Sequence, residues 1–190
     1  LEFRRVLFRS GIPVVELMDS QSPCLDIAVG FDNFEAARQM TAAIIARGHR
    51  HVAYLGARLD ERTIIKQKGY EQAMLDAGLT PYSVMVEQSS SYTSGIELMR
   101  QARREYPQLD GIFCTNDDLA VGAAFECQRL GLKIPDDMAI AARLALQPAM
   151  PAALALPQHA PAAHFISTAS HNSVTRSSNA NRGHYSPFRP

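Results

Sequence analysis

The sequence has 190 residues, of which 46% are apolar, and this is enough for one compact domain of ordinary size. The 19 basic and 19 acidic residues cancel overall, but residues 11–142 hold twelve basic against eighteen acidic side chains. An acidic surface repels a phosphate backbone, so we do not expect this segment to bind nucleic acid by itself. The sequence has no apolar run of about 18 residues, which excludes a membrane-spanning helix.

Both ends of the chain differ from the middle. Residues 1–10 combine apolar and basic side chains without the apolar stretch of a secretion signal, and we interpret them as a non-native leader. Residues 143–190 contain no acidic residue and are rich in Ala and Pro at first, then in Ser, Asn and His. This composition predicts disorder. A natural flexible tail and a frame-shifted or vector-derived end both explain it, and we favour the second.

Four short apolar runs predict the strands of a sheet, at residues 51–56, 83–87, 109–114 and 138–142. Their starts are about 30 residues apart, which is the size of a βαβ module. Between and before them lie four amphipathic stretches that predict helices. Alternation of this kind predicts an α/β fold in which a parallel sheet has helices on both faces. Two further strand-like runs, at 12–15 and 27–30, are expected to belong to a second sheet.

The helices have recognisable end signals. Asn33 is expected to cap a helix over 34–47, and a second helix is predicted over 63–77. A third is expected to begin at a capping box formed by Ser94 and Glu97. The fourth is expected to begin at Asp117 or Asp118 and to bury Val121, Ala124 and Phe125. Gly48, Gly78 and Gly131 are the expected stops of the first, second and fourth helices.

The three cysteines, Cys24, Cys114 and Cys127, are odd in number and form no C-x-x-C pair. Two of them lie in apolar runs, which favours buried thiols over disulfides and a reducing cytoplasm as the compartment.

Ligands of open parallel sheets bind beyond the carboxyl ends of the strands. Arg62 and Thr63 follow the first predicted strand, Lys66 lies in the first turn of the next helix, and Asn116 follows the third strand. These amide, hydroxyl and cationic groups suit an oxygen-rich ligand, and Arg62 or Lys66 suits a carboxylate. The alternative for each is an exposed side chain in a loop, with Asn116 serving as a helix cap.

Catalytic and cofactor motifs are absent from the sequence. There is no dinucleotide-binding glycine pattern, no phosphate-binding loop and no nucleophile elbow, so we expect neither an enzyme nor a cofactor. His49 and His51 are too few to predict a metal site.

Ordered motifs over about 130 residues resemble the LacI/GalR family of transcriptional repressors. They are Ile12-Pro-Val-Val, Gly30-Phe-Asp-Asn, Gly48-His-Arg, Tyr54-Leu-Gly, Lys68-Gly-Tyr, Asp76-Ala-Gly, Phe113-Cys-Thr-Asn-Asp, Ala120-Val-Gly-Ala and Ile134-Pro-Asp-Asp. As a set these motifs are highly specific. The sequence departs from the family pattern after Ala141, where an acidic ligand-binding residue is expected and Ala142-Arg143-Leu144 stands instead.

The resemblance implies a core similar to periplasmic sugar-binding proteins, with an effector bound between two subdomains. Residues 11–34 then form a remnant of the N-terminal subdomain and the crossover, and residues 35–142 form the C-terminal effector-binding subdomain. Asn116 matches the ligand-contacting Asn of the family, and Asp32 is expected to join the site from the Gly30–Asn33 motif. Lys66 stands where relatives have an Arg, so we expect it to pair, with Arg62, the carboxylate of an aldonic acid such as gluconate.

The resemblance also implies a cytoplasmic homodimer that contacts operator DNA only through an N-terminal helix-turn-helix headpiece, which these 190 residues lack. A sugar-binding protein of a transport system shares the fold and is the alternative.

Overall fold

A computed structural model of the chain describes Val6 and residues 12–17, 26–142 and 173–176. The chain divides into two units, one of Leu1–Asp32 with Ser170–Pro190 and a larger one of Asn33–Ala169. The leader predicted at residues 1–10 lies outside the described residues apart from Val6, and so does the tail predicted at 143–190 apart from 173–176.

The smaller unit holds a three-stranded sheet of β1 (Val15–Leu17), β2 (Ile27–Gly30) and β7 (Ser173–Arg176). β1 pairs parallel to β2, as expected of a second sheet, although this strand lies two to three residues later than the predicted run 12–15. β7 pairs antiparallel to β2, with Ala28 opposite Thr175. At these four residues the prediction of a disordered tail is wrong, because backbone pairing with β2 gives a strand that side-chain composition does not predict.

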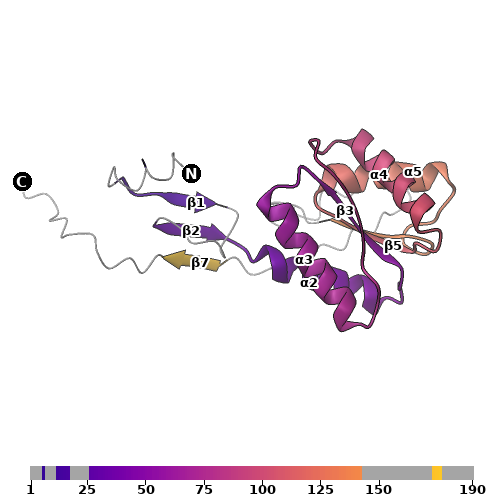
Figure 1. The fold of residues 1–190 in the computed structure, drawn as a ribbon, viewed down its shortest axis with the longest axis horizontal. Coiled ribbons are helices and arrows are strands. Elements are labelled where there is room, and N and C mark those ends of the chain that lie inside the picture. Colours follow the sequence, from indigo (N-terminus) through magenta and orange to yellow (C-terminus); the bar gives the residue numbers. More distant parts are fainter. Residues whose placement is uncertain (1–5, 7–11, 18–25, 143–172, 177–190) are drawn as a thin grey trace, which may run out of the picture. The chain divides into compact units, whose positions relative to one another are not determined.

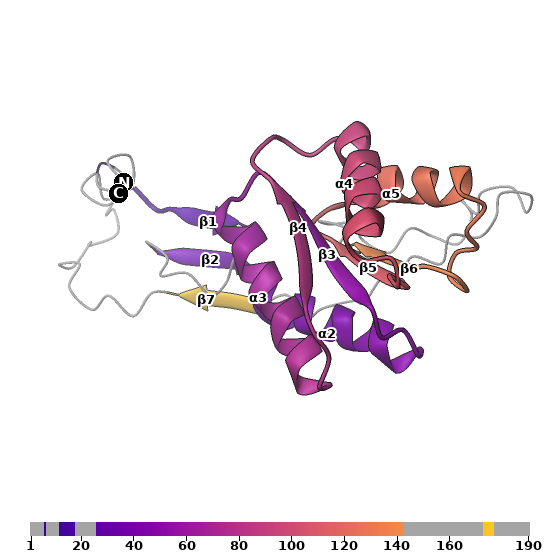
Figure 2. The same ribbon diagram turned by 45° about the vertical axis from the view of Figure 1, so that its right-hand side comes forward.

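The larger unit alternates helices and strands as predicted (Figure 1). In chain order the elements are α2 (Asn33–Ala46), β3 (Val52–Ala57), α3 (Glu61–Asp76), β4 (Tyr82–Val86), α4 (Tyr92–Glu105), β5 (Gly111–Cys114), α5 (Asp117–Arg129) and β6 (Ala139–Ala142). All four strands are parallel, in the order β4-β3-β5-β6, which Figure 2 shows from one side of the sheet. The α/β prediction, with a parallel sheet, is therefore confirmed.

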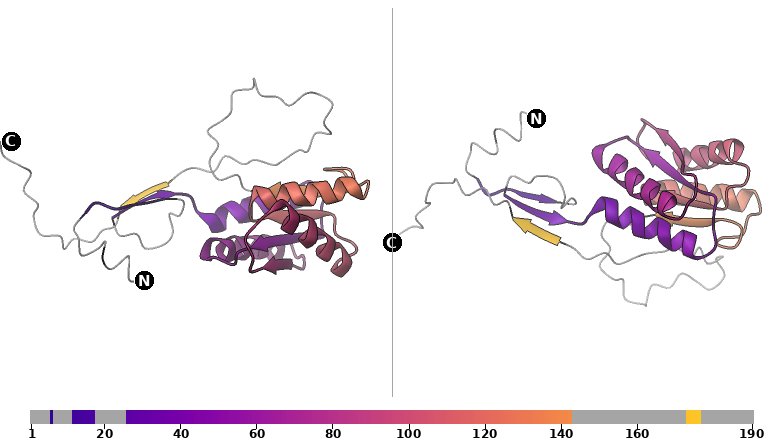
Figure 3. Two further views of the ribbon diagram at one scale, coloured as in Figure 1. Left: turned by 90° about the horizontal axis from the view of Figure 1, so that it is seen from above. Right: turned by 60° about the horizontal axis from the view of Figure 1, so that its bottom comes forward.

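Two apolar layers flank the sheet because alternate strand residues point to opposite faces. On β3, Tyr54 packs with residues of α2 and α3, whereas Leu55 packs with residues of α4 and α5. The same alternation continues on β5, where Phe113 belongs to the first cluster and Cys114 to the second. Helices α2 and α3 lie side by side on one face, as the views of Figure 3 also show, and α4 and α5 lie on the other. The predicted helices on both faces are confirmed.

The C-terminal stops were predicted correctly for three helices, but two starts differ from the prediction. Helix α2 already includes Asn33, its predicted cap, and α3 begins two residues before the predicted 63, with Asp60 as its cap. Gly48, Gly78 and Gly131 follow α2, α3 and α5 with positive φ angles of 102°, 67° and 73°, a conformation that glycine adopts without steric cost. The predicted cap of α4 is wrong. Ser91 is the cap and accepts a hydrogen bond from the Ser94 backbone nitrogen at 3.0 Å, so that the helix begins three residues earlier than expected.

The predicted buried face of α5 is also wrong. Phe125 is 54% exposed, and the buried residues of this helix include Leu119, Ala120, Ala123 and Cys127. Cys114 and Cys127 are buried and free, which confirms the prediction of buried thiols for these two residues, while Cys24 lies outside the described residues.

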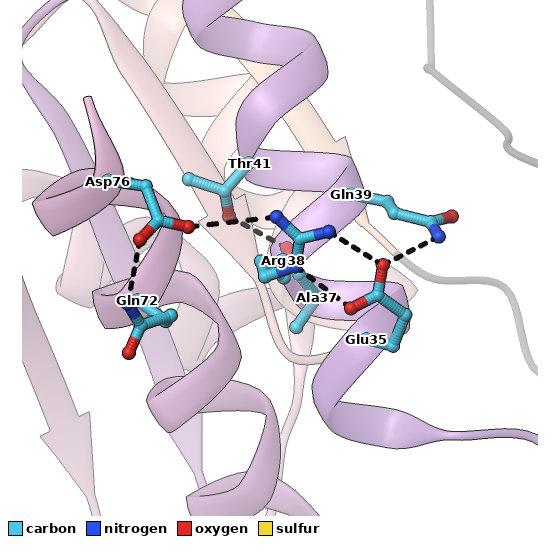
Figure 4. A network of polar contacts seen from close by, with 7 residues as sticks. All are labelled: Glu35, Ala37, Arg38, Gln39, Thr41, Gln72 and Asp76. Atoms are coloured by element: carbon cyan, nitrogen blue, oxygen red, sulfur yellow. Dashed lines mark hydrogen bonds and ion pairs between the residues drawn. The ribbon is translucent and has the colours of Figure 1, made fainter.

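Polar contacts join the outer surfaces of α2 and α3 (Figure 4). The Arg38 guanidinium donates to both carboxylate oxygens of Glu35, at 2.8 and 2.9 Å, and lies 3.6 Å from an Asp76 carboxylate oxygen on α3. The Arg38 hydrogen bond is the main cause that lowers the pKa of Glu35. These side chains are partly exposed to solvent, so the ion pairs add little stability.

Candidate functional site

The site lies where the strand order reverses. From β3 the chain continues through α3 to β4 on one side, and it later returns to β5 on the other side of β3. Consequently α3 leaves β3 toward one face and α5 leaves β5 toward the other. Crevices of this kind, at the carboxyl ends of adjacent parallel strands, are where open α/β sheets bind ligands.

The loop from β3 to α3 has a constrained backbone. Arg58 and Leu59 have φ angles of 74° and 46°, a left-handed conformation that non-glycine residues rarely adopt. The Arg58 backbone nitrogen donates to the carbonyl oxygens of Val86 and Gln88, at 3.0 and 2.9 Å, and this holds the turn. Unfavourable backbone angles of this type gather at functional sites, where the surrounding structure stabilises them.

Asp60 caps α3 and organises the first turn. Its carboxylate accepts the Thr63 backbone N–H at 2.9 Å and lies 3.4 Å from the Arg62 guanidinium. Partial burial opposes ionisation of Asp60, but the hydrogen bonds from Thr63 and the Arg62 charge outweigh it and lower the pKa. Arg62 is therefore held beside an acidic neighbour. Thr63 is buried, and its hydroxyl donates to the Ala57 carbonyl oxygen at 3.3 Å. This hydrogen bond joins the first turn of α3 to the last residue of β3.

Asn116 caps α5, as one of the two sequence interpretations predicts. Its side-chain oxygen accepts the Leu119 backbone N–H at 3.2 Å, which leaves the amide N–H₂ as the group that can donate to a ligand. The following residue, Asp117, has a raised pKa because of burial and then repulsion from Asp118, opposed by attraction to Lys66.

Lys66 connects α3 with the segment that follows β5. Its ammonium donates to the backbone carbonyl of Thr115 at 3.0 Å, across from α3 to the residue that precedes Asn116. The structure therefore brings Lys66 and Asn116 to the same edge of the sheet, as the strand-end argument predicts. Arg62 and Thr63 lie in the first turn of α3, about one turn before Lys66. Asp32 belongs to the smaller unit, and its membership of the site stays a prediction.

Sequence reasoning missed the supporting role of Tyr54. The Tyr54 hydroxyl lies 2.8 Å from the Thr63 carbonyl oxygen and 2.8 Å from the Thr115 hydroxyl. It therefore contacts both the first turn of α3 and the segment after β5. The signal available was a tyrosine inside an otherwise apolar strand, since a buried Tyr hydroxyl usually has a hydrogen-bond partner.

Two features of the described residues bear on other functions. In that part of the chain, no three His, Cys, Asp or Glu side chains gather in a way that suits a metal ion. Within the same ranges, every helix is too short or too polar to cross a lipid bilayer.

Comparison with known proteins identifies the family. Residues 5–159 match the model described as "Periplasmic binding proteins and sugar binding domain of LacI family". The chain belongs to this family. The resemblance stated from the motifs is therefore confirmed, together with the fold that it implies.

Relatives in the family are named as transcriptional regulators. The chain is 93% identical over 132 residues to the HTH-type transcriptional regulator GntR of Escherichia coli K12, covering 70% of this chain and 40% of that protein. It is 44% identical over 138 residues to the regulator IdnR of the same strain, covering 72% and 42%. The crystal structure of transcription regulator GntR from Chromobacterium violaceum superposes with a TM-score of 0.71 at 36% identity, covering 78% of this chain and 55% of that one.

The chain thus spans about 40% of the length of the curated relatives it matches. Within the family, its motifs predict a likeness to the gluconate operon repressor, and the identity of 93% to a regulator GntR confirms that prediction.

Proposed function

We propose that this chain is the effector-sensing core of a LacI-type transcriptional repressor, and that the effector is gluconate or a related aldonate. The observation that carries the proposal is the 3.0 Å hydrogen bond from the Lys66 ammonium to the Thr115 carbonyl. It holds a cation beside the amide of Asn116, at the switch point between β3 and β5. A cation next to an amide donor suits a ligand with a carboxylate at one end and hydroxyls along its length.

In this proposal Lys66 pairs the carboxylate and Asn116 donates to a hydroxyl, with Arg62 and Thr63 as further members of the site. Effector binding changes the relative stability of two arrangements of the core and so alters the affinity for operator DNA. Contact with DNA is assigned to a helix-turn-helix headpiece outside these 190 residues. No catalytic step is proposed, which agrees with relatives that are named as regulators.

The main alternative is a sugar-binding protein of a transport system, a class that the family description also covers. The names of the similar proteins favour the regulator, since relatives with 93%, 44% and 36% identity are named as transcriptional regulators.

The test of the effector site is the substitution Lys66→Ala in a full-length regulator that contains these residues. We expect gluconate affinity, measured by isothermal titration calorimetry, to fall by about tenfold, because a charge-assisted hydrogen bond is lost. Lys68→Ala is the matched control, since Lys68 carries the same charge on the exposed surface of the same helix. A change of less than about twofold for Lys66→Ala would show that Lys66 does not bind the carboxylate.

We further propose that the intact regulator is a homodimer and works in the cytoplasm, as the family resemblance implies. Light scattering of the purified full-length protein is expected to give twice the mass of a single chain, with and without gluconate. A single-chain mass at every protein concentration would contradict the proposal.

A further inference from the structure

Tyr54 lies in the middle of β3 with no exposed surface, yet its hydroxyl contacts both loops of the candidate site. The Tyr54 oxygen is 2.8 Å from the Thr63 carbonyl oxygen in the first turn of α3. It is also 2.8 Å from the hydroxyl of Thr115, the residue after β5. Thr63 and Thr115 are separated by 52 residues in sequence, so this single hydroxyl joins two distant segments.

The direction of these hydrogen bonds follows from counting protons. A carbonyl oxygen only accepts, so the Tyr54 hydroxyl donates its one proton to Thr63. The Tyr54 oxygen then accepts from the Thr115 hydroxyl, whose single proton also lies within reach of the Leu55 carbonyl oxygen at 3.1 Å. Burial is the main cause that raises the pKa of Tyr54, and the hydroxyl therefore keeps its proton at neutral pH.

The two segments that Tyr54 contacts, the first turn of α3 and the loop after β5, each lead to a residue of the candidate site. Thr63 lies one turn before Lys66 on α3, and Thr115 immediately precedes Asn116. The backbone carbonyl of Thr115 is itself the acceptor for Lys66. The hydrogen bonds therefore form one connected unit that runs from α3 through Tyr54 to Thr115 and back to α3 through Lys66.

We propose that the hydroxyls of Tyr54 and Thr115 are positioning groups that set the separation of Lys66 and Asn116 and thereby tune effector affinity. This inference rests on the proposed function for the ligand, but the positioning of the loops is a property of the protein alone. Neither hydroxyl is assigned a contact with the effector. Their action is indirect, because ordered supporting groups hold ligand-binding side chains at the productive distance.

The neighbouring Tyr70 provides a matched control. Its ring stacks on that of Tyr54, with centroids 5.7 Å apart, and it is equally buried. However, the Tyr70 hydroxyl contacts the Val52 carbonyl at 2.7 Å and the backbone of Tyr82 at 2.8 and 2.9 Å. Val52 and Tyr82 are the first residues of β3 and β4, at the end of the sheet opposite to the site.

The experiment compares Tyr54→Phe with Tyr70→Phe in a full-length regulator that contains these residues. We expect both substitutions to lower the melting temperature, because each removes buried hydrogen bonds. Only Tyr54→Phe is expected to weaken gluconate binding in calorimetry, by about fivefold. Wild-type affinity in both variants would overturn the proposal, whereas failure of the wild-type protein to bind gluconate would overturn the proposed function instead.

A second measurement needs no ligand. Amide hydrogen exchange of the segment 115–119 is expected to be faster in Tyr54→Phe than in Tyr70→Phe, and equal exchange in the two would also overturn the proposal. If Tyr54→Phe does not fold, the comparison moves to Thr115→Val, which removes the hydroxyl, and Thr115→Ser, which retains it. The serine variant is then expected to keep wild-type exchange and affinity while the valine variant loses both, and identical behaviour of the two would overturn the proposal.

Discussion

Replacing Gly122 with alanine is expected to lower the free energy of unfolding by about 3 kcal/mol, because α4 and α5 touch through their backbones at this position. A Cβ atom on Gly122 would lie 2.1 Å from the Tyr92 carbonyl oxygen and 2.9 Å from the Gly95 Cα. Neither atom belongs to a flexible side chain, so the two helices must move apart. Their separation would open the apolar layer that they form over the sheet.

Gly78→Ala is the matched control for this prediction. Gly78 has a φ of 67° but no atom within 4 Å of an added Cβ, so alanine there has only a conformational cost of about 1 kcal/mol. Urea unfolding of the two variants and the wild-type chain measures the difference. Equal midpoints for Gly122→Ala and Gly78→Ala would show that the α4–α5 contact is not close.

The layered fold was predictable from sequence because its signals are local. Short apolar runs gave the strands, and turn signals such as Gly48 and Gly131 gave the helix ends. These signals depend on residues a few positions apart, and the buried core of β3, from Val52 to Ala57, leaves little choice of structure.

The buried face of α5 was not predictable in the same way, because this helix carries apolar residues on more than one side. Val121 and Phe125 form one apolar stripe, and Leu119 and Ala123 form another, and both fit the helical period. The close contact of Gly122 with α4 selects the second stripe. That choice depends on where α4 lies, and the spacing of apolar residues along α5 carries no information about the position of α4. The wrong prediction of the α4 cap has a similar cause. Ser91 and Ser94 are both good capping residues, and the local sequence does not select between them.

The candidate site was predictable only in part, because it also depends on which segments become neighbours in the fold. The positions of Lys66 and Asn116 after two strands implied that they share one edge of the sheet. The strand order was not available, so the adjacency of β3 and β5 that brings Lys66 to Thr115 was not predicted. The role of Tyr54 depends entirely on that adjacency.

Glu126 is a buried carboxylate that joins α4 to α5. Only 2% of its side-chain surface is exposed, and it accepts from Arg129 at 2.6 and 2.9 Å on its own helix. Arg100 on α4 lies 3.0 Å from the same carboxylate. The hydrogen bonds of Arg129 are the largest cause that lowers the pKa of Glu126, to about 2 from its usual 4.5, and Arg100 adds to the effect.

Because the folded protein lowers this pKa, ionised Glu126 stabilises the fold at all pH values above the ordinary value near 4.5, and the stabilisation is lost as pH falls toward 2.

Glu126→Gln is expected to lower the free energy of unfolding by about 2 kcal/mol at neutral pH, since a neutral amide replaces a doubly paired carboxylate. The deficit should shrink between about pH 5 and about pH 2, because only the wild-type chain loses this contribution there. Urea unfolding at a series of pH values measures both curves, with Glu105→Gln on exposed α4 surface expected to run parallel to the wild type. Parallel curves for Glu126→Gln as well would mean that the two arginines do not hold this carboxylate ionised, and the α4–α5 pair would then depend on the Gly95–Gly122 backbone contact and apolar packing alone.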